Sequence, residues 1–215
     1  MVIDPHQYVK TQENTQILLM RHPETVANAQ KRYLGSQNMP LSTLGEQQCA
    51  WAIEGLVAYQ PAAIVSSPLE RCLAIAVPAA ERLGIELEID ARLGEMGFGV
   101  LEGLTYQEAV EQKLSFPWGE TAPLWPVEGG ERIEDFAARL LLATRSLEKR
   151  RGKTAVVAHG GVIRGIASYW LHMPLEFIWT IAVRNVESAL FCNDNEGTVY
   201  LDRFGIKPEW LTANL

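Results

Sequence analysis

Short, continuously apolar runs alternate with longer amphipathic stretches along this chain of 215 residues. Two such runs are Ile17–Met20 and Ala62–Val65, and each is followed by a segment with helical spacing of apolar residues. Runs without polar alternation are typical of parallel strands that helices cover on both faces. The sequence therefore predicts the α/β class, a three-layer α/β/α sandwich around a mostly parallel sheet. The pattern leaves open whether one edge strand is antiparallel.

The length suits a single domain with a well-buried core. Residues 1–16 are mostly polar and are predicted to form a flexible N-terminal leader, so residues 17–215 form the domain. Prolines and glycines interrupt the helical pattern over residues 101–130, and this stretch is predicted to be an insertion or lid over the functional site. Ser67-Pro68 is typical of a helix start, with the serine as N-cap and the proline in the first turn.

Composition narrows the range of partners. The formal net charge is −7, from 26 acidic and 19 basic residues, which disfavours binding to nucleic acid or an anionic membrane. Three widely spaced cysteines do not form a disulfide framework, and no apolar stretch has the length of a membrane span. We therefore expect a cytoplasmic protein with a small-molecule partner, and the sequence leaves a homodimer open.

Side chains suited to phosphate binding follow the predicted strands. Arg21-His22 ends the first strand, Arg71 lies one turn into the helix after the second, and His159-Gly160-Gly161 ends a later one. The carboxyl ends of parallel strands share one edge of the sheet, so these residues are expected to meet there. One histidine at a strand end is usually structural. Two histidines with two arginines and bare glycine backbone suit a phosphoryl group.

These residues also carry a family resemblance. Arg21-His22-Pro23-Glu24-Thr25 resembles the Arg-His-Gly-Glu-Thr signature of the histidine phosphatase superfamily, which is phosphoglycerate mutase-like. The agreement continues, in family order, through Asn28, Arg32, Gly35, Pro40–Gly45, Gln48, Ser66–Arg71, Leu93–Glu95, Glu102-Gly103, Gly129–Glu131 and Val157–Arg164. Pro23 departs from the signature, because it stands where the family has glycine and removes a backbone donor.

The resemblance implies a mechanism that needs no metal and no cofactor. His22 is implied to be the nucleophile that becomes phosphorylated, and Glu95 the acid that protonates the leaving group. A protonated or donor His159, Arg21, Arg71, Asn28 and the backbone of Gly160 are implied to hold the phosphoryl oxygens. Glu102 competes with Glu95 for the acid role, and we expect it to be structural.

The predicted lid favours a phosphatase over a mutase. It contains one lysine and no arginine, whereas a mutase has to retain a bisphosphorylated intermediate. Phe116, Trp118 and Trp125 in it are candidate contacts for a neutral, partly apolar leaving group. We therefore predict a phosphoric monoester hydrolase acting on a small molecule such as α-ribazole phosphate, a sugar phosphate or a nucleotide. The alternatives are a phosphoglycerate mutase-type phosphotransferase and an inactive phospho-ligand-binding scaffold.

Overall fold

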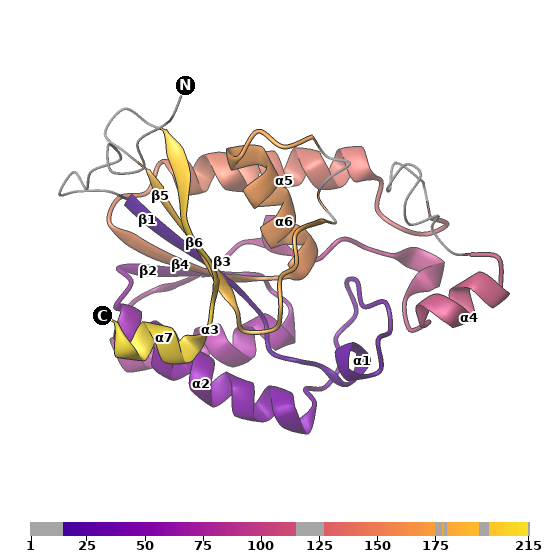
Figure 1. Cartoon of the computed structure of the whole chain (residues 1–215), viewed down its shortest axis with the longest axis horizontal. Helices are drawn as coiled ribbons and strands as arrows, with labels where there is room; N and C mark the ends of the chain where they lie inside the picture. The colour runs from indigo at the N-terminus through magenta and orange to yellow at the C-terminus, as the bar shows by residue number, and fades with distance from the viewer. Residues whose placement is uncertain (1–14, 115–126, 175–177, 179, 194–197, 215) are drawn as a thin grey trace, which may run out of the picture.

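The computed structural model describes residues 15–114, 127–174, 178, 180–193 and 198–214. Within this part of the chain, helices cover both faces of a six-stranded sheet (Figure 1). The strands are β1 (Thr15–Arg21), β2 (Ala63–Ser66), β3 (Leu87–Ile89), β4 (Lys153–Ala158), β5 (Ser188–Asn193) and β6 (Val199–Ile206). The helices are α1 (Val26–Ala29), α2 (Thr43–Tyr59), α3 (Glu70–Leu83), α4 (Tyr106–Glu111), α5 (Ile133–Glu148), α6 (Gly160–Trp170) and α7 (Pro208–Ala213).

The layers follow the predicted α/β/α arrangement. Figure 1 shows α5 and α6 on one face of the sheet, α2, α3 and α7 on the other, and α1 and α4 beyond the carboxyl ends of the parallel strands. The strand order is β3-β2-β4-β1-β5-β6. The first four in that order are parallel, while β5 is antiparallel to β1 and β6 to β5. The predicted fold class is confirmed, with an antiparallel pair at one edge.

Strand β1 lies near the centre of the sheet and is buried on both faces. Leu18 and Met20 pack among residues of α2 and α3, whereas Ile17 and Leu19 pack among residues of α5 and α6. A large apolar side chain stabilises the fold by about 1.5–3 kcal/mol when fully buried, so apolar residues are favoured on both faces of β1. This two-sided burial explains why the run is not interrupted by polar residues.

The start of α3 differs from the prediction. The helix begins at Glu70, with Leu69 as its N-cap, so Ser67 is not the capping residue. Its hydroxyl accepts a weak hydrogen bond from the Leu69 amide, at 3.3 Å, and also bonds the ring of His159. The hydroxyl of Ser67 therefore bonds His159 at the end of β2 and does not cap the helix, which begins at Glu70. Pro78 lies inside α3 without ending it.

The predicted boundaries of the leader and lid fall partly outside the described residues. β1 begins at Thr15, two residues before the predicted start of the domain at residue 17. Within the stretch 101–130, the structure describes α4, whose start is closed by a capping box between Thr105 and Glu108. Phe116, Trp118 and Trp125 lie outside the described residues, so their lid contacts stay predictions. No described helix is long and apolar enough to cross a membrane.

Candidate active site

The pairing of β1 with β4 brings the two strand-end histidines together. Arg21 pairs with Ala158 at the end of the two strands, and the amide of His22 donates to the carbonyl oxygen of Ala158 at 2.9 Å. The next residues are His22 and His159, whose ring centroids are 5.1 Å apart. Both rings are almost completely buried. The site therefore forms where the prediction placed it, at the carboxyl edge of the sheet.

The ring of His22 is held in one tautomer. Its Nδ1 lies 2.7 Å from the carbonyl oxygen of Pro23, and an oxygen acceptor at that distance requires a proton on Nδ1. Nε2 of the neutral ring then carries the lone pair. Burial, together with the guanidinium groups of Arg21 and Arg71, holds the pKa of His22 well below its usual range. The ring is therefore neutral at pH 7, as a nucleophile requires.

Pro23 keeps the feature of the loop that this tautomer needs. The proline removes a backbone N–H, but the acceptor for Nδ1 is its carbonyl oxygen, which every residue type provides. Residues outside the loop also hold it in place. The amide of Glu24 donates to Gln48 Oε1 at 2.7 Å, and the carboxylate of Glu24 accepts from the Ser42 hydroxyl at 2.7 Å. Proline in place of glycine is thus compatible with the orientation of His22.

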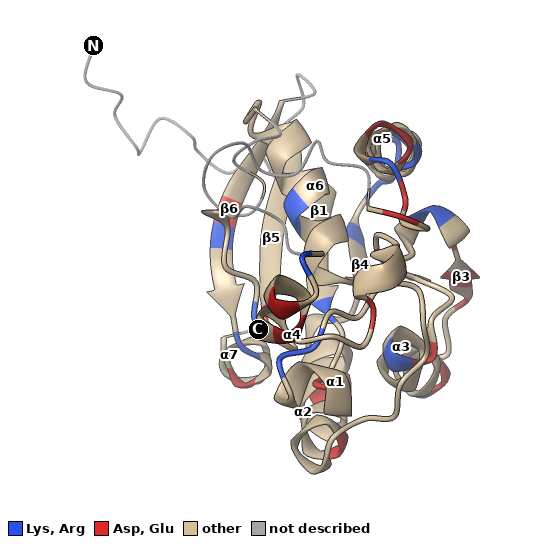
Figure 2. Ribbon diagram, turned by 90° about the vertical axis from the view of Figure 1, so that its right-hand side faces the viewer, with Lys and Arg blue, Asp and Glu red and all other residues tan. Residues whose placement is uncertain are grey.

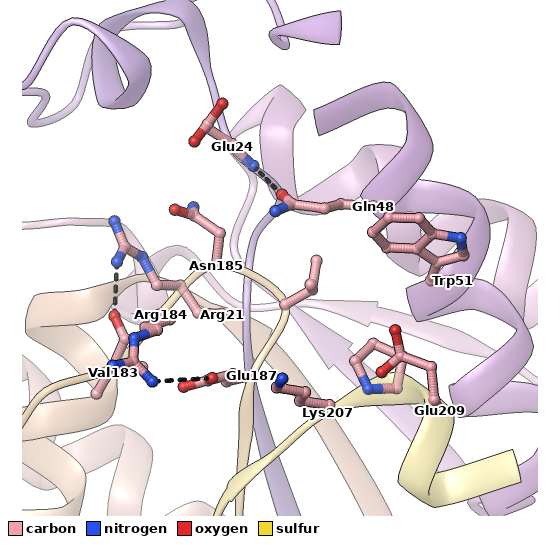
Figure 3. A pocket seen from close by; sticks show the side chains of 12 residues that line it. Arg21, Glu24, Gln48, Trp51, Val183, Arg184, Asn185, Glu187, Lys207 and Glu209 are labelled. Carbon is pink, nitrogen blue, oxygen red and sulfur yellow. Dashed lines mark hydrogen bonds and ion pairs between the residues drawn. The ribbon is translucent and has the colours of Figure 1, made fainter. Parts of the chain in front are cut away.

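Arg21 carries a donor that lacks a partner among the described residues. Its Nη1 donates to the carbonyl oxygen of Val183 at 2.6 Å (Figure 3), while its Nε is buried and unbonded. Burial lowers the pKa of Arg21 to about 10, so the guanidinium still carries its charge at pH 7. A buried, unbonded N–H of a cation is unfavourable unless an anion binds to it.

Arg71 is buried and braced by backbone oxygens. Nη1 donates to the carbonyl of Gln37 and Nη2 to that of Gly35, each at 2.7 Å, and Nε donates to Nδ1 of His159 at 3.2 Å. A guanidinium has five N–H donors, so two remain, one on each terminal nitrogen. The prediction that Arg71 reaches the site is compatible with this geometry, and its forked end keeps donors for an oxyanion.

The hydrogen bonds of His159 show which ring nitrogen can act as a donor. Because its Nδ1 accepts from Arg71, the proton of the neutral ring is on Nε2, which donates to Ser67 Oγ at 2.7 Å. Burial, together with the guanidinium charges of Arg71 and Arg21, holds the pKa of His159 well below its usual range. Of the two forms expected, protonated or donor, the structure favours the neutral donor, because this fully buried ring lies among cations. Its donor is Nε2–H, held by Ser67.

Glu95 lies against the first turn of α6. Its Oε2 accepts from the amide of Gly161 at 3.2 Å, and its Oε1 accepts from the amide of Met96 at 3.0 Å. A Cβ at position 161 would lie 2.4 Å from Oε1, so glycine is what leaves room for the carboxylate. The competitor Glu102 instead accepts from the backbone amides of Ser36 and Phe98, as expected of a structural residue.

Asn28 and Asn185 connect the segment after β1, which carries His22, to the loop before β5. Asn28 Oδ1 accepts from the amide of Thr25 at 3.2 Å and from Asn185 Nδ2 at 3.4 Å, which leaves its amide hydrogens as donors. Asn185 Nδ2 also donates to the carbonyl oxygen of His22 at 3.0 Å. Asn185 could not be recognised from the sequence, because it lies in no motif and far along the chain from His22.

Two further arginines were missed at the sequence level. Arg164 lies four residues after Gly160, on the same face of α6, and a Cβ at position 160 would be 3.2 Å from its Nη1. Arg139 donates to the carbonyl oxygens of Arg92, Gly94 and Glu95 and pairs with Glu131 at 2.6 Å. The spacing of Arg164 from Gly160 is visible in the sequence, whereas Arg139 contacts three backbone oxygens and Glu131, and no motif marks these contacts.

Two cavities adjoin this site. One, of about 690 Å³, lies beside the segment after β1 and is lined by Arg21, Asn28, Lys31, Arg32, Tyr33, Tyr106 and Asn185. The other, of about 460 Å³, lies on the outer side of residues 183–187 and also reaches α2 and α7 (Figure 3). Its lining includes three carboxylates, those of Glu24, Glu187 and Glu209. The same lining holds three basic side chains, those of Arg21, Arg184 and Lys207, whereas the lining of the first cavity has three basic residues and no acidic one. The first cavity is therefore the better candidate for a phosphate ester.

Neutral histidines, buried arginines and a carboxylate at the start of a helix define a phosphoryl-transfer site of the phosphohistidine type. Comparison with known proteins identifies the family. Residues 17–203 match the family model of the histidine phosphatase superfamily, branch 1, so the chain belongs to this superfamily. The predicted family and the predicted enzyme class, a phosphoric monoester hydrolase, are both confirmed.

Several relatives bear names of specific enzymes. A glucosyl-3-phosphoglycerate phosphatase of Mycolicibacterium vanbaalenii is 33% identical over 171 residues, which cover 74% of this chain and 76% of the relative. One of the same name from Mycobacterium tuberculosis is 34% identical over 171 residues, with the same coverage. A probable phosphoglycerate mutase of Citrobacter koseri is 32% identical over 165 residues, covering 74% of this chain and 76% of the relative.

Solved structures share the fold over nearly the whole chain. The YhfR protein of Bacillus stearothermophilus superimposes with a TM-score of 0.80 at 28% identity, covering 90% of this chain and 98% of the other. A mycobacterial glucosyl-3-phosphoglycerate phosphatase in complex with VO3 gives a TM-score of 0.76 at 28% identity, covering 89% of this chain and 99% of the other. The fold established above is therefore that of the histidine phosphatases.

Proposed function

We propose that the protein hydrolyses a small-molecule phosphate monoester through a phosphohistidine on His22. One observation carries this assignment. The hydrogen bond from His22 Nδ1 to Pro23 fixes an unprotonated Nε2 among two buried guanidinium groups, one of which has an unbonded Nε. A neutral nucleophile next to unsatisfied cationic donors suits attack on a phosphorus atom that carries negatively charged oxygens.

In the first step, Nε2 of His22 attacks phosphorus and the bond from phosphorus to the ester oxygen breaks. Glu95, protonated for this step, gives its proton to the leaving oxygen. In the second step a water molecule attacks the phosphohistidine, Glu95 takes its proton, and the bond from phosphorus to nitrogen breaks. Inorganic phosphate leaves, and both side chains return to their starting states.

The remaining residues stabilise charge on the phosphoryl oxygens. We assign this role to Arg21 Nε, the two unused donors of Arg71, the amide hydrogens of Asn28 and the backbone N–H of Gly160. The start of α6 adds the positive end of the helix dipole. In this scheme His159 Nε2–H exchanges Ser67 for a phosphoryl oxygen, so the neutral ring still serves as a donor.

Hydrolysis of p-nitrophenyl phosphate tests the assignment, with wild type, His22→Ala and His172→Ala compared. We expect activity in the presence of chelator, its loss by at least about a thousandfold in His22→Ala, and no change in His172→Ala, since His172 is exposed. A label from the substrate should appear on His22 as an acid-labile phosphate. Full activity of His22→Ala would refute the mechanism.

A phosphoglycerate mutase is the second candidate function, because a probable phosphoglycerate mutase is among the relatives. Phosphate release and isomer formation are therefore both measured with 3-phosphoglycerate, with and without its bisphosphate primer. A phosphatase releases phosphate without primer. Interconversion of the two phosphoglycerates that depends on primer would instead establish the mutase, and absence of both reactions with every ester tried would favour an inactive scaffold.

A further inference from the structure

The segment that carries Glu95 belongs to no helix or strand. It lies between two 3₁₀ turns, η1 (Ala91–Leu93) and η2 (Gly99–Leu101). The Glu95 carboxylate accepts from two backbone amides, those of Met96 and Gly161, at 3.0 and 3.2 Å. Because a proton is transferred only over hydrogen-bond distance, the position of this segment decides whether Glu95 can act as an acid.

Arg139 on α5 holds one end of this segment. α5 packs against η1, and Figure 2 shows the helix nearly end-on, with both basic and acidic residues on it. Nη1 of Arg139 donates to the carbonyl oxygens of Arg92 and Gly94, at 2.6 and 2.7 Å, and Nη2 donates to that of Glu95 at 3.2 Å. One side chain therefore fixes three backbone oxygens, and one of them belongs to Glu95 itself.

Glu131 orients this guanidinium and holds the other end of the segment. Its Oε1 accepts from Arg139 Nε at 2.6 Å and its Oε2 from Nη2 at 2.8 Å. Each side chain is 22% exposed, so the forked pair is shielded from most of the solvent. The amide of Glu131 donates to the Gly97 carbonyl oxygen at 2.9 Å, and Oε2 also accepts from the Gly97 amide at 3.4 Å. The segment is thus held on both sides of Glu95.

The donor count of Arg139 separates it from the arginines of the phosphoryl site. A guanidinium has five N–H donors. In Arg139 each of the five has an acceptor, either a carboxylate oxygen of Glu131 or one of the three backbone oxygens. Arg21 instead keeps an unbonded Nε, and Arg71 keeps two donors. Arg139 therefore has no donor left for a phosphoryl oxygen, and it can affect catalysis only through the groups that it holds.

We propose that Arg139 is the positioning residue for Glu95 and keeps its carboxyl group within reach of the leaving oxygen. This inference rests on the proposed function. A displacement of about 1 Å in a reacting group can slow a reaction by about a hundredfold. Lysine does not replace Arg139, because an ammonium group is a point charge with three donors and lacks the planar fork that Glu131 and the carbonyl oxygens bind.

Two esters isolate the function of Glu95. Glycerol 3-phosphate has a leaving group that needs a proton, whereas p-nitrophenolate leaves without one. The quantity measured is kcat/KM for glycerol 3-phosphate divided by kcat/KM for p-nitrophenyl phosphate, on one preparation of each variant. We expect this ratio to fall about tenfold in Arg139→Gln and at least about fivefold in Arg139→Lys. Partial unfolding does not move the ratio, because the inactive fraction cancels.

Arg92 offers a matched control. Its side chain also forms a forked pair with a carboxylate, that of Asp90, with Nη2 and Oδ2 2.6 Å apart, and it lies three residues before Glu95. Arg92→Lys should therefore keep the wild-type ratio. A fall in Arg92→Lys as large as that in Arg139→Lys would refute the inference. A wild-type ratio in Arg139→Lys would refute it too, since charge alone would then suffice.

A double variant tests whether Arg139 acts through Glu95. Glu95→Gln with Arg139→Gln should have the same ratio as Glu95→Gln alone, because the acid is already absent. A further fall in the double variant would contradict the positioning role. If Glu95→Gln lowers the ratio while both Arg139 variants keep the wild-type value, the role of Arg139 is refuted and the phosphatase stands. If wild type hydrolyses neither ester, the proposed function itself fails.

Discussion

The hydroxyl oxygen of Ser67 lies 2.7 Å from Nε2 of His159 and accepts its hydrogen bond. Both residues are fully buried, and Ser67 directly follows β2 while His159 directly follows β4. Because Arg71 occupies the other ring nitrogen, Ser67 fixes which way the ring faces and where its one proton lies. Ser67 is thus a positioning residue for His159.

Replacement of Ser67 by alanine should affect catalysis and stability together. The Nε2–H of His159 would lose its acceptor, at a cost of about 1–3 kcal/mol in the free energy of unfolding. We expect kcat to fall about tenfold with little change in KM. Ser66→Ala is the matched control, because Ser66 is also buried and donates to the Ser67 carbonyl oxygen at 2.9 Å without bonding the ring. An equal fall of kcat in the control would contradict the positioning role.

The Glu95→Gln variant should show a loss that depends on the leaving group. A glutamine cannot supply a proton, so hydrolysis of an alkyl phosphate should slow by about a hundredfold or more, and that of p-nitrophenyl phosphate by much less. Comparison of kcat for the two esters measures this difference. Glu102→Gln should lower the melting temperature while the ratio of the two rates stays at the wild-type value. Identical losses with both esters would exclude the acid role of Glu95.

Gly161→Ala should displace the carboxylate without unfolding the protein. The new Cβ would lie 2.4 Å from Glu95 Oε1, and the carboxylate is the group that can move. We expect kcat for an alkyl phosphate to approach that of Glu95→Gln. Combining the two substitutions should then add little, since both remove one function. Additive losses in the double variant would show that Gly161 acts independently of Glu95.

The two buried histidines should make the protein less stable in mild acid. In the unfolded chain each takes up a proton near pH 6.5, whereas the folded protein keeps them neutral to lower pH. Below pH 6.5 the unfolded state therefore binds more protons, and the free energy of unfolding falls as pH falls. The slope is at most about 1.4 kcal/mol per pH unit for each histidine. Urea titrations at pH 7.5 and 5.5 measure it.

The control for that slope is a pair of substitutions. His22→Gln should remove part of the pH dependence, and His22→Gln with His159→Gln should remove more, because glutamine does not titrate. Carboxylates contribute equally to all three proteins, so the comparison isolates the histidines. The same pH dependence in wild type and double variant would contradict the depressed pKa values.

The sequence predicted the parts of the site that depend on the sheet. His22 and His159 could be placed together because buried apolar runs identify parallel strands, and the ends of such strands share an edge. Glu95 could be placed only through the family resemblance, since its contact with Gly161 joins a loop to the first turn of α6, 66 residues further along the chain. These residues occupy regular positions or recognisable motifs.

Other features of the site depend on tertiary packing and could not be predicted from the sequence. Ser67 looked like a helix cap, because Ser-Pro is a common helix start and nothing nearby in sequence indicates a histidine partner. Asn185 lies in a loop, and only the folded chain brings its side-chain amide to the carbonyl oxygen of His22. The neutral state of His159 depends on burial and on surrounding cations, and neither can be read from a strand-end histidine alone.

The adjacency of β1 and β4 has a consequence for how activity arises. His22 and His159 are 137 residues apart in the chain, and they meet because these two strands pair. Closing so long a loop is entropically unfavourable, and non-local strand pairing is slow compared with helix formation. Recovery of helical signal during refolding should therefore precede recovery of enzyme turnover. The return of catalytic activity therefore reports when β1 and β4 have paired and the sheet is complete.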